Sequence, residues 1–292
     1  MAAIFVGQQL VSAQSTEASV APRTPWGAPD LGGVWDFRTT TPLERPDEFS
    51  GREELTIEET AAQKAQANEF LKFADAPPPE GDPGGYNSFW FDTAGIVDDR
   101  RTSLIVDPPD GKLPALKTGA AHQVGSLAVD VPGPGPVRYR VGGSGVESPE
   151  ARGLAERCIL GFANGPPLTP GGYNQNIQLF QTAEYVVILN EMVHDPRIVA
   201  LDGRPHLPED MRQWNGDARG HWDGDTLVIE STNFTDQTAS FAPNAAVAMG
   251  TGENLLLTER LSRVNADVMR YEFTVDDPTT FTRPFTAAIP LR

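Results

Sequence analysis

The chain has 292 residues, of which 39% are hydrophobic, and a formal net charge of −17 at pH 7. This length and apolar content suffice for one large β domain or two smaller domains with a real core. The strong negative charge repels polyanions and therefore argues against nucleic acid and anionic membrane surfaces as partners. The single cysteine, Cys158, excludes an internal disulfide, and its short amphipathic surroundings predict a buried thiol.

Residues 1–30 indicate the remnant of an export signal followed by a linker. The N-terminal segment MAAIFVGQQLVSAQSTEA has a short apolar beginning and a small-residue site at Val11-Ser12-Ala13. It lacks the positively charged region of a full signal peptide, so the signal looks truncated. No apolar run in the chain is long enough to span a bilayer. We expect an exported protein, either periplasmic or secreted.

A first strand is predicted at Gly33-Val34-Trp35, and a helix follows it. Thr56 and Glu59 have the spacing of a capping box, in which each side chain bonds a free backbone N–H of the other residue. The helix is predicted to run from Ile57 to Phe73 and to stop at the following prolines. We expect it to be an accessory element without chemistry of its own.

The region from 38 to 170 is predicted to hold this helix and long loops that cover the domain. A short strand is expected at 103–107, before the turn Pro108-Pro109-Asp110-Gly111. The stretch from 115 to 148 is rich in Gly and Pro and shows no strand pattern.

Strand signals become dense after residue 176. Eight strands are predicted, at 177–181, 184–193, 197–201, 218–222, 225–233, 254–264, 268–275 and 281–289. Short connections between them predict an antiparallel meander, and the pair Asp223-Gly224 is typical of a tight hairpin. A meander of this length usually closes into a barrel, because closure removes the unpaired edges. We therefore predict a mainly β protein with a single barrel domain over 31–292; a two-sheet sandwich is the alternative.

The segment 185–193, YVVILNEMV, is apolar at nearly every position, which predicts a strand buried on both faces. Asn190 and Glu191 interrupt it, and burying such groups is costly unless they are paired. A carboxylate in apolar surroundings has a raised pKa and serves as a general acid or base near neutral pH. Glu191 is therefore a catalytic candidate; the alternative is an ion pair with Arg197, Arg219 or Arg260.

His194 at the end of this strand is a second catalytic candidate. Strand alternation places it on the opposite face from Glu191, so we treat the two as competing candidates. The spacings of His194, His206 and His221 match no compact metal motif. Tracing an antiparallel meander puts His194 and His221 at one end and His206 at the other. We therefore expect no metal and no other cofactor, with a two-histidine site using Asp195 or Asp223 left open.

Polar and aromatic residues near this strand are candidates for binding a substrate. The same trace places Tyr173, Asn174 and Asn176 near His194, where amides and a phenol suit hydroxyl or carbonyl groups. Tyr173 is also taken as a catalytic candidate. The long connections at the other end favour a mouth there instead. The further substrate-binding candidates are Asn190, Arg197, His206 and Trp214.

Several segments together resemble a large family of exported bacterial proteins of unassigned function. They are RTSLIVDPPDGKLP, ERCI, YVVILNEMVHDPRIVALDGRPHLP, GHWDGDTLVIESTNF and YEFTVDDPTTFTRPFTAAIPL. The resemblance implies export and one intact domain, and it implies no activity. Separately, the Gly-x-Trp at Gly33-Val34-Trp35 resembles the start of lipocalin-type barrels, which implies only the fold.

Three functions are compatible with these patterns. The favoured one is a metal-independent acid–base enzyme (a lyase, isomerase, cyclase or hydrolase) acting on a small oxygenated or polycyclic organic compound. The second is a non-catalytic barrel that binds a small hydrophobic or sugar-like ligand, and the third is a structural envelope protein. The expected partner is a small molecule; the oligomeric state is left open.

Overall fold

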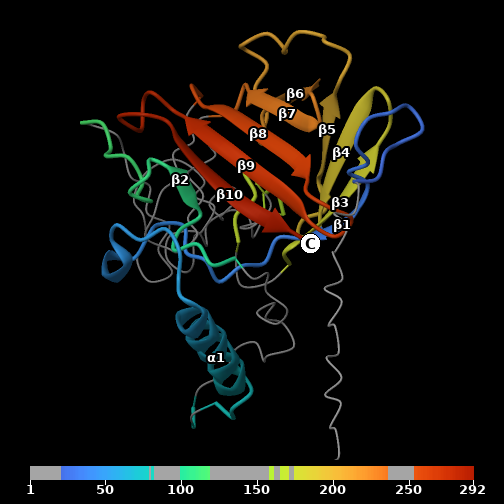
Figure 1. Cartoon of the computed structure of the whole chain (residues 1–292). Coiled ribbons are helices and arrows are strands. Elements are labelled where there is room, and N and C mark those ends of the chain that lie inside the picture. Colours follow the sequence, from blue (N-terminus) through green and yellow to red (C-terminus); the bar gives the residue numbers. More distant parts are fainter. Residues whose placement is uncertain are drawn as a thin grey trace, which may run out of the picture.

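The computed structural model describes residues 21–78, 80–81, 99–118, 158–160, 165–170, 174–235 and 253–292. Within these ranges the chain is mainly β. Ten strands form one curled, mostly antiparallel sheet (Figure 1). They are β1 (Gly33–Asp36), β2 (Ile105–Asp107), β3 (Asn176–Gln181), β4 (Tyr185–Asn190), β5 (Pro196–Ala200), β6 (Asp217–Asp223), β7 (Thr226–Thr232), β8 (Leu256–Arg263), β9 (Met269–Asp276) and β10 (Phe285–Leu291).

The strand order is β1-β3-β4-β5-β6-β7-β8-β9-β10-β2, so β1 and β2 form the two edges. The eight strands predicted after residue 176 are confirmed as β3 to β10. The predicted closure into a barrel is wrong, because the curled sheet stays open as a half-barrel. The sandwich alternative is also wrong for the described residues, since their strands belong to one sheet.

The side of β10 that faces away from β9 explains why the sheet stays open. The Ala288 N–H bonds to the Leu104 carbonyl at 2.9 Å, and Arg101 donates to the Ala288 carbonyl at 2.8 Å. Pro290, two residues further, has no N–H to offer a neighbouring strand. Strand β1 therefore meets β10 only at its tip, where the Arg292 N–H donates to the Asp36 carbonyl at 2.9 Å.

One step in the sheet differs from the predicted meander. Strands β5 and β6 run parallel, with the single registered pair Ala200 and Arg219. A parallel neighbour requires a connection that returns to the starting end of the sheet, and residues 201–216 are long enough for that return. As a consequence, Asp217 at the start of β6 lies at the same end of the sheet as Pro196, and His221 lies further toward the other end. The trace that paired His194 with His221 is therefore wrong.

The core lies on the concave side of the curl. It is built from alternate residues of the strands, for example Leu257 and Leu261 of β8 and Phe273 of β9. Trp35 of β1 is 4% exposed, and its indole N–H donates to the Leu31 carbonyl at 2.9 Å. The Arg263 guanidinium lies over the Trp35 ring, 5.0 Å from its centre, and shields this end of the core.

The predicted helix is confirmed as α1 (Ile57–Ala74), which projects away from the sheet in Figure 1. Its capping box is formed: Glu59 accepts from the Thr56 N–H at 2.8 Å, and Thr56 accepts from the Glu59 N–H at 3.2 Å. A three-residue 3₁₀ turn, Asp47–Phe49, precedes it. Cys158, expected to be buried, is exposed.

Candidate functional site

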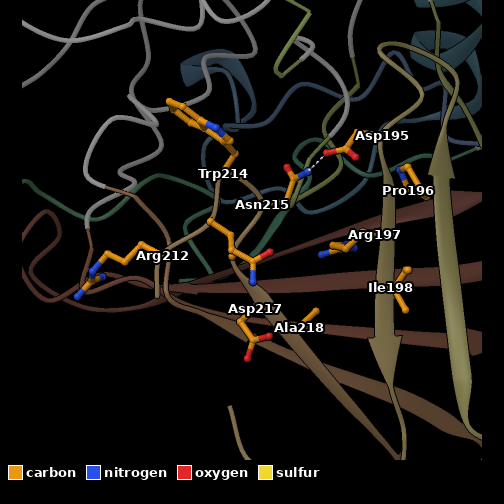
Figure 2. A pocket seen from close by; sticks show the side chains of 11 residues that line it. Asp195, Pro196, Arg197, Ile198, Arg212, Trp214, Asn215, Asp217 and Ala218 are labelled. Atoms are coloured by element: carbon orange, nitrogen blue, oxygen red, sulfur yellow. Dashed lines mark hydrogen bonds between the residues drawn. The ribbon is translucent and has the colours of Figure 1, made fainter. Parts of the chain in front are cut away.

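A pocket of about 480 Å³ lies where β5 and β6 separate. The two strands approach closely at Gly220, where a Cβ atom would lie 2.7 Å from Leu201 and 2.8 Å from Val199. They diverge from there toward Pro196 and Asp217, and Figure 2 shows the pocket in the resulting gap. Its lining is Asp195, Pro196, Arg197, Ile198, Arg212, Gln213, Trp214, Asn215, Gly216, Asp217 and Ala218.

The wall opposite β5 is a tight turn that ends at Gly216. The Gln213 N–H donates to the Asn233 carbonyl at 2.8 Å, which fixes the start of the turn. Gly216 has φ +69°, and a Cβ there would lie 2.7 Å from the Thr232 carbonyl oxygen. Only glycine fits both the left-handed backbone and this close approach. The turn therefore holds Trp214 at the pocket.

Arg197 belongs to a buried ion pair behind the pocket. Its guanidinium bonds both carboxylate oxygens of Glu259, through Nη1 to Oε2 and through Nη2 to Oε1 at 2.9 Å. The side chains are 6% and 0% exposed. Burial works to lower the pKa of Arg197, but the charge and hydrogen bonds of Glu259 raise it above its ordinary value. Arg197 therefore carries its positive charge at neutral pH.

Tyr271 completes this buried group. Its hydroxyl donates to Glu259 Oε1 at 2.7 Å and accepts from the Leu168 N–H at 3.1 Å. Burial raises the pKa of the Tyr271 phenol well above its ordinary value, and the Glu259 charge adds to this. Tyr271 thus remains a donor to the carboxylate.

A second polar group forms the far wall. The Asp217 carboxylate is 5% exposed and accepts from the Leu207 N–H at 3.0 Å and from Arg219 at 2.6 Å. His206 Nδ1 lies 2.9 Å from Asp217 Oδ2. In Figure 2 the carboxylate points away from Trp214, so Asp217 organises the wall more than it faces the cavity.

Asp195 and Asn215 bridge the two walls. The Asn215 side-chain amide donates to Asp195 Oδ2 at 2.9 Å, the dashed line in Figure 2. The Asn215 Oδ1 atom is buried and has no hydrogen-bond partner among the residues that the structure describes. A buried acceptor without a donor is costly, so a bound donor would stabilise this position.

The predicted site residues do not all gather in one place. Arg197 and Trp214 line the pocket together, and His206 lies behind its wall through Asp217. Tyr173 lies outside the described residues. Asn174 is half-buried with φ +57°.

The premise that selected Glu191 does not hold. Strand β4 buries Val186 and Ile188, but its other residues are only partly covered. Glu191 follows the strand and is exposed, and it accepts from the Asn176 side chain at 2.9 Å. Burial of β4 is limited to one of its faces, because little of the described chain covers the other face of the curled sheet.

The neighbours of Glu191 are also at the surface or only half-covered. His194 is exposed and has a left-handed backbone, with φ +47°. Asn190 is half-buried, and its buried Oδ1 atom has no hydrogen-bond partner within the described ranges. The roles predicted for these residues remain predictions.

The described part of the chain contains neither a metal-ligand cluster nor a membrane-spanning helix. No three His, Cys, Asp or Glu side chains of those residues come together as they would at a metal ion, so the two-histidine site with Asp195 or Asp223 is not found there. None of the helices in those ranges has the length and apolar character of a membrane span.

Sequence reasoning missed Glu259, Tyr271 and Asp217, and it named Asp195 only as a possible metal ligand. For Glu259 a signal was present, because it alternates with Leu257 and Leu261 and so falls on their buried face.

The chain was compared with protein-family models, curated proteins and solved structures. None of the three comparisons gives a match. The two resemblances drawn from the sequence therefore stay predictions, and function has to be argued from the pocket itself.

Proposed function

We propose that the pocket between β5 and β6 binds a small, uncharged, oxygen-rich organic compound of the sugar-like kind. One observation carries the proposal: an indole, two side-chain amides, two carboxylates and two guanidinium groups share one lining. Pockets for small molecules combine an apolar surface with a few placed polar groups in about 300–1,000 Å³. The volume of about 480 Å³ falls in that range.

The charges of the lining favour an uncharged ligand. Most charges of the lining are already balanced by ion pairs. Arg197 pairs with Glu259, Asp217 with Arg219, and Arg212 with Glu253. The chain as a whole has a net charge of −17, which repels small anions from solution. A hydroxyl-rich compound meets both conditions, because its groups donate to carboxylates and accept from amides and guanidinium groups.

Trp214 provides the apolar part of the recognition. Among the described residues that line the pocket it is the only aromatic one, and it is half-buried. The flat indole offers a large surface to the carbon face of a ring, while its N–H remains available to an oxygen atom. The tight turn at Gly216 fixes the indole at the pocket before the ligand arrives, which reduces the entropy lost on binding.

Calorimetric titration with D-glucose, D-galactose, maltose and cellobiose tests this proposal. We expect the wild-type protein to bind at least one of them, and the Trp214→Ala variant to lose at least tenfold in affinity. Trp26→Ala is the matched control, because Trp26 is 46% exposed and does not line the pocket. Absence of heat with all four sugars, or equal affinity of the two variants, would contradict the proposal.

Acid–base catalysis is a second candidate, and one observation favours it. Asp195, a carboxylate able to accept a proton, lines the same pocket as the buried guanidinium of Arg197, which can stabilise developing negative charge. Release of nitrophenol from 4-nitrophenyl β-D-galactoside would support hydrolysis. An Asp195→Asn variant should then lose about a hundredfold in rate. A His194→Ala variant with full turnover would remove His194 from the mechanism.

A further inference from the structure

The buried group of Arg197, Glu259 and Tyr271 is a costly way to fill a core. The three residues are 7%, 0% and 1% exposed. Taking a carboxylate and a guanidinium out of water costs several kcal/mol each in general, and apolar residues of similar size often replace such pairs without loss of stability. Leu257 and Leu261, two positions away on the same face of β8, are buried leucines, so an apolar residue would suit the position of Glu259. The pair therefore needs an explanation other than stability.

The position of Arg197 supplies that explanation. A guanidinium has five N–H groups. Two hydrogen bonds bind it to Glu259, and no other bond of Arg197 is found among the described residues. Arg197 also lines the pocket, and Figure 2 shows its guanidinium reaching from β5 toward the opposite wall. Donors thus remain beside the cavity, on a side chain that is held rigidly from behind.

The hydrogen bonds behind Arg197 fix its direction. Glu259 holds two of its nitrogen atoms, Tyr271 holds Glu259, and the Leu168 N–H holds the Tyr271 hydroxyl. Each group in this series of hydrogen bonds has its partner, so none of them has to reorient when a ligand binds. Such preorganised donors bind more strongly than flexible surface ones.

Building on the proposed function, we propose that Arg197 donates a hydrogen bond to an uncharged acceptor oxygen of the ligand, a carbonyl or a hydroxyl, and that Glu259 and Tyr271 act as positioning residues. Glu259 already balances the charge of Arg197, so the pair attracts a dipole more than an anion. A carboxylate ligand would bring an uncompensated negative charge close to buried Glu259.

Acetamide and acetate test this choice, since they have nearly the same size and differ in charge. Binding is followed by chemical shifts of the Trp214 indole N–H and of the backbone amides of Gln213 to Ala218. We expect acetamide to bind the wild-type protein at least tenfold more tightly than acetate. Equal or tighter binding of acetate, or no binding of either compound, would overturn the inference.

Two variants separate positioning from a merely structural role. Glu259→Gln keeps the size of the side chain but leaves Arg197 with its full charge, so the preference should change to acetate. The triple variant Arg197→Met, Glu259→Leu, Tyr271→Phe should keep a melting temperature within a few degrees of wild type. It should also lose at least tenfold in affinity for acetamide. If it binds acetamide as the wild type does, Arg197 is not the donor, even should Glu259→Gln fail to fold.

The results distinguish this inference from the proposed function. If no sugar binds but the acetamide preference and its loss in the triple variant are observed, the inference about Arg197 stands and the sugar-like ligand is wrong. If a sugar binds the wild type and the triple variant equally well, the pocket proposal stands and the inference about Arg197 fails.

Discussion

Asp277 shows how a single carboxylate can fix a turn. It follows β9 and is 1% exposed. Its two oxygen atoms accept from the hydroxyls of Thr279 and Thr280, both at 2.6 Å, and from the backbone N–H groups of the same residues at 3.0 and 3.1 Å. Burial acts to raise the pKa of Asp277, but these hydrogen bonds hold it below its ordinary value.

This lowered pKa has a consequence for stability at acid pH. A carboxylate with a lower pKa in the folded state stabilises the fold above its unfolded pKa of 3.8, and this contribution disappears as the pH falls through the folded pKa. We expect Asp277→Asn to lower the free energy of unfolding by about 1–3 kcal/mol at pH 7. The difference from wild type should shrink steadily below about pH 4.

Urea unfolding of both proteins between pH 7 and pH 2.5 measures this difference. Glu209→Gln removes the same charge at an exposed site and should leave the stability at pH 7 unchanged. A difference between wild type and Asp277→Asn that stays constant over the whole range would contradict the role given to the carboxylate.

Glu191 and Glu259 show what residue patterns in a sequence can predict. Glu191 stands in an apolar run that predicts burial, but the strand ends at Asn190 and leaves it exposed. Glu259 stands among alternating leucines and is fully buried. Alternation identifies the inward face of a strand, whereas a continuous apolar run does not say where the strand ends. The partner of Glu259, Arg197, is 62 residues away in the chain, and no local pattern links the two.

At the scale of elements, α1 is an unusual case of a long helix with little packing. None of its side chains that the structure describes is buried, and Phe70 is 45% exposed. Most helices are stabilised by tertiary packing of an apolar face, so α1 depends more than usual on its cap.

The capping box should therefore matter locally and hardly at all globally. Thr56→Ala removes the acceptor of the Glu59 N–H and should cost the helix about 1 kcal/mol. Hydrogen exchange in α1 should become faster by roughly fivefold, while the melting temperature of the sheet stays the same. Thr56→Ser retains the hydroxyl and should exchange as wild type does. A lower melting temperature for Thr56→Ala would mean that α1 supports the sheet.

The sequence predicted the strands better than any other element. It did not predict the direction in which each strand runs relative to its neighbour. The residue alternation of β8 and β9 and the hairpin Asp223-Gly224 are local, so they can be recognised without the fold. The parallel step from β5 to β6 depends on the path of a connection without regular structure, which sequence patterns do not encode. The pocket exists because of that step, so its location could not be predicted although Arg197 and Trp214 were named.

At the scale of the molecule, the first strand of the sheet contacts the residue that follows the last strand in the chain. The tip of β1 meets the end of β10 through two backbone hydrogen bonds, from the Arg292 N–H to the Asp36 carbonyl and from the Asp36 N–H to the Arg292 carbonyl. These residues are distant in sequence, so their contact joins the edge strand β1 to the end of β10 at one corner. Its loss should open the sheet from that corner.

Arg292→Pro tests the corner, because proline has no N–H to donate. We expect the melting temperature to fall by about 2–4 °C for each kcal/mol lost, with a loss of about 1–3 kcal/mol. Arg292→Ala keeps the backbone donor and serves as the control. Equal melting temperatures of the two variants would show that this hydrogen bond does not join the sheet.

The central claim is that the gap between β5 and β6 is a ligand pocket closed on one side by Trp214. The most direct measurement is a ¹H–¹⁵N NMR spectrum that resolves the indole N–H groups, of which the chain has five. Titration with the sugar that binds in calorimetry should shift the Trp214 indole signal most, and the Asn215 side-chain signals with it. A titration that leaves Trp214 unmoved while another tryptophan shifts would place the binding site elsewhere and contradict the claim.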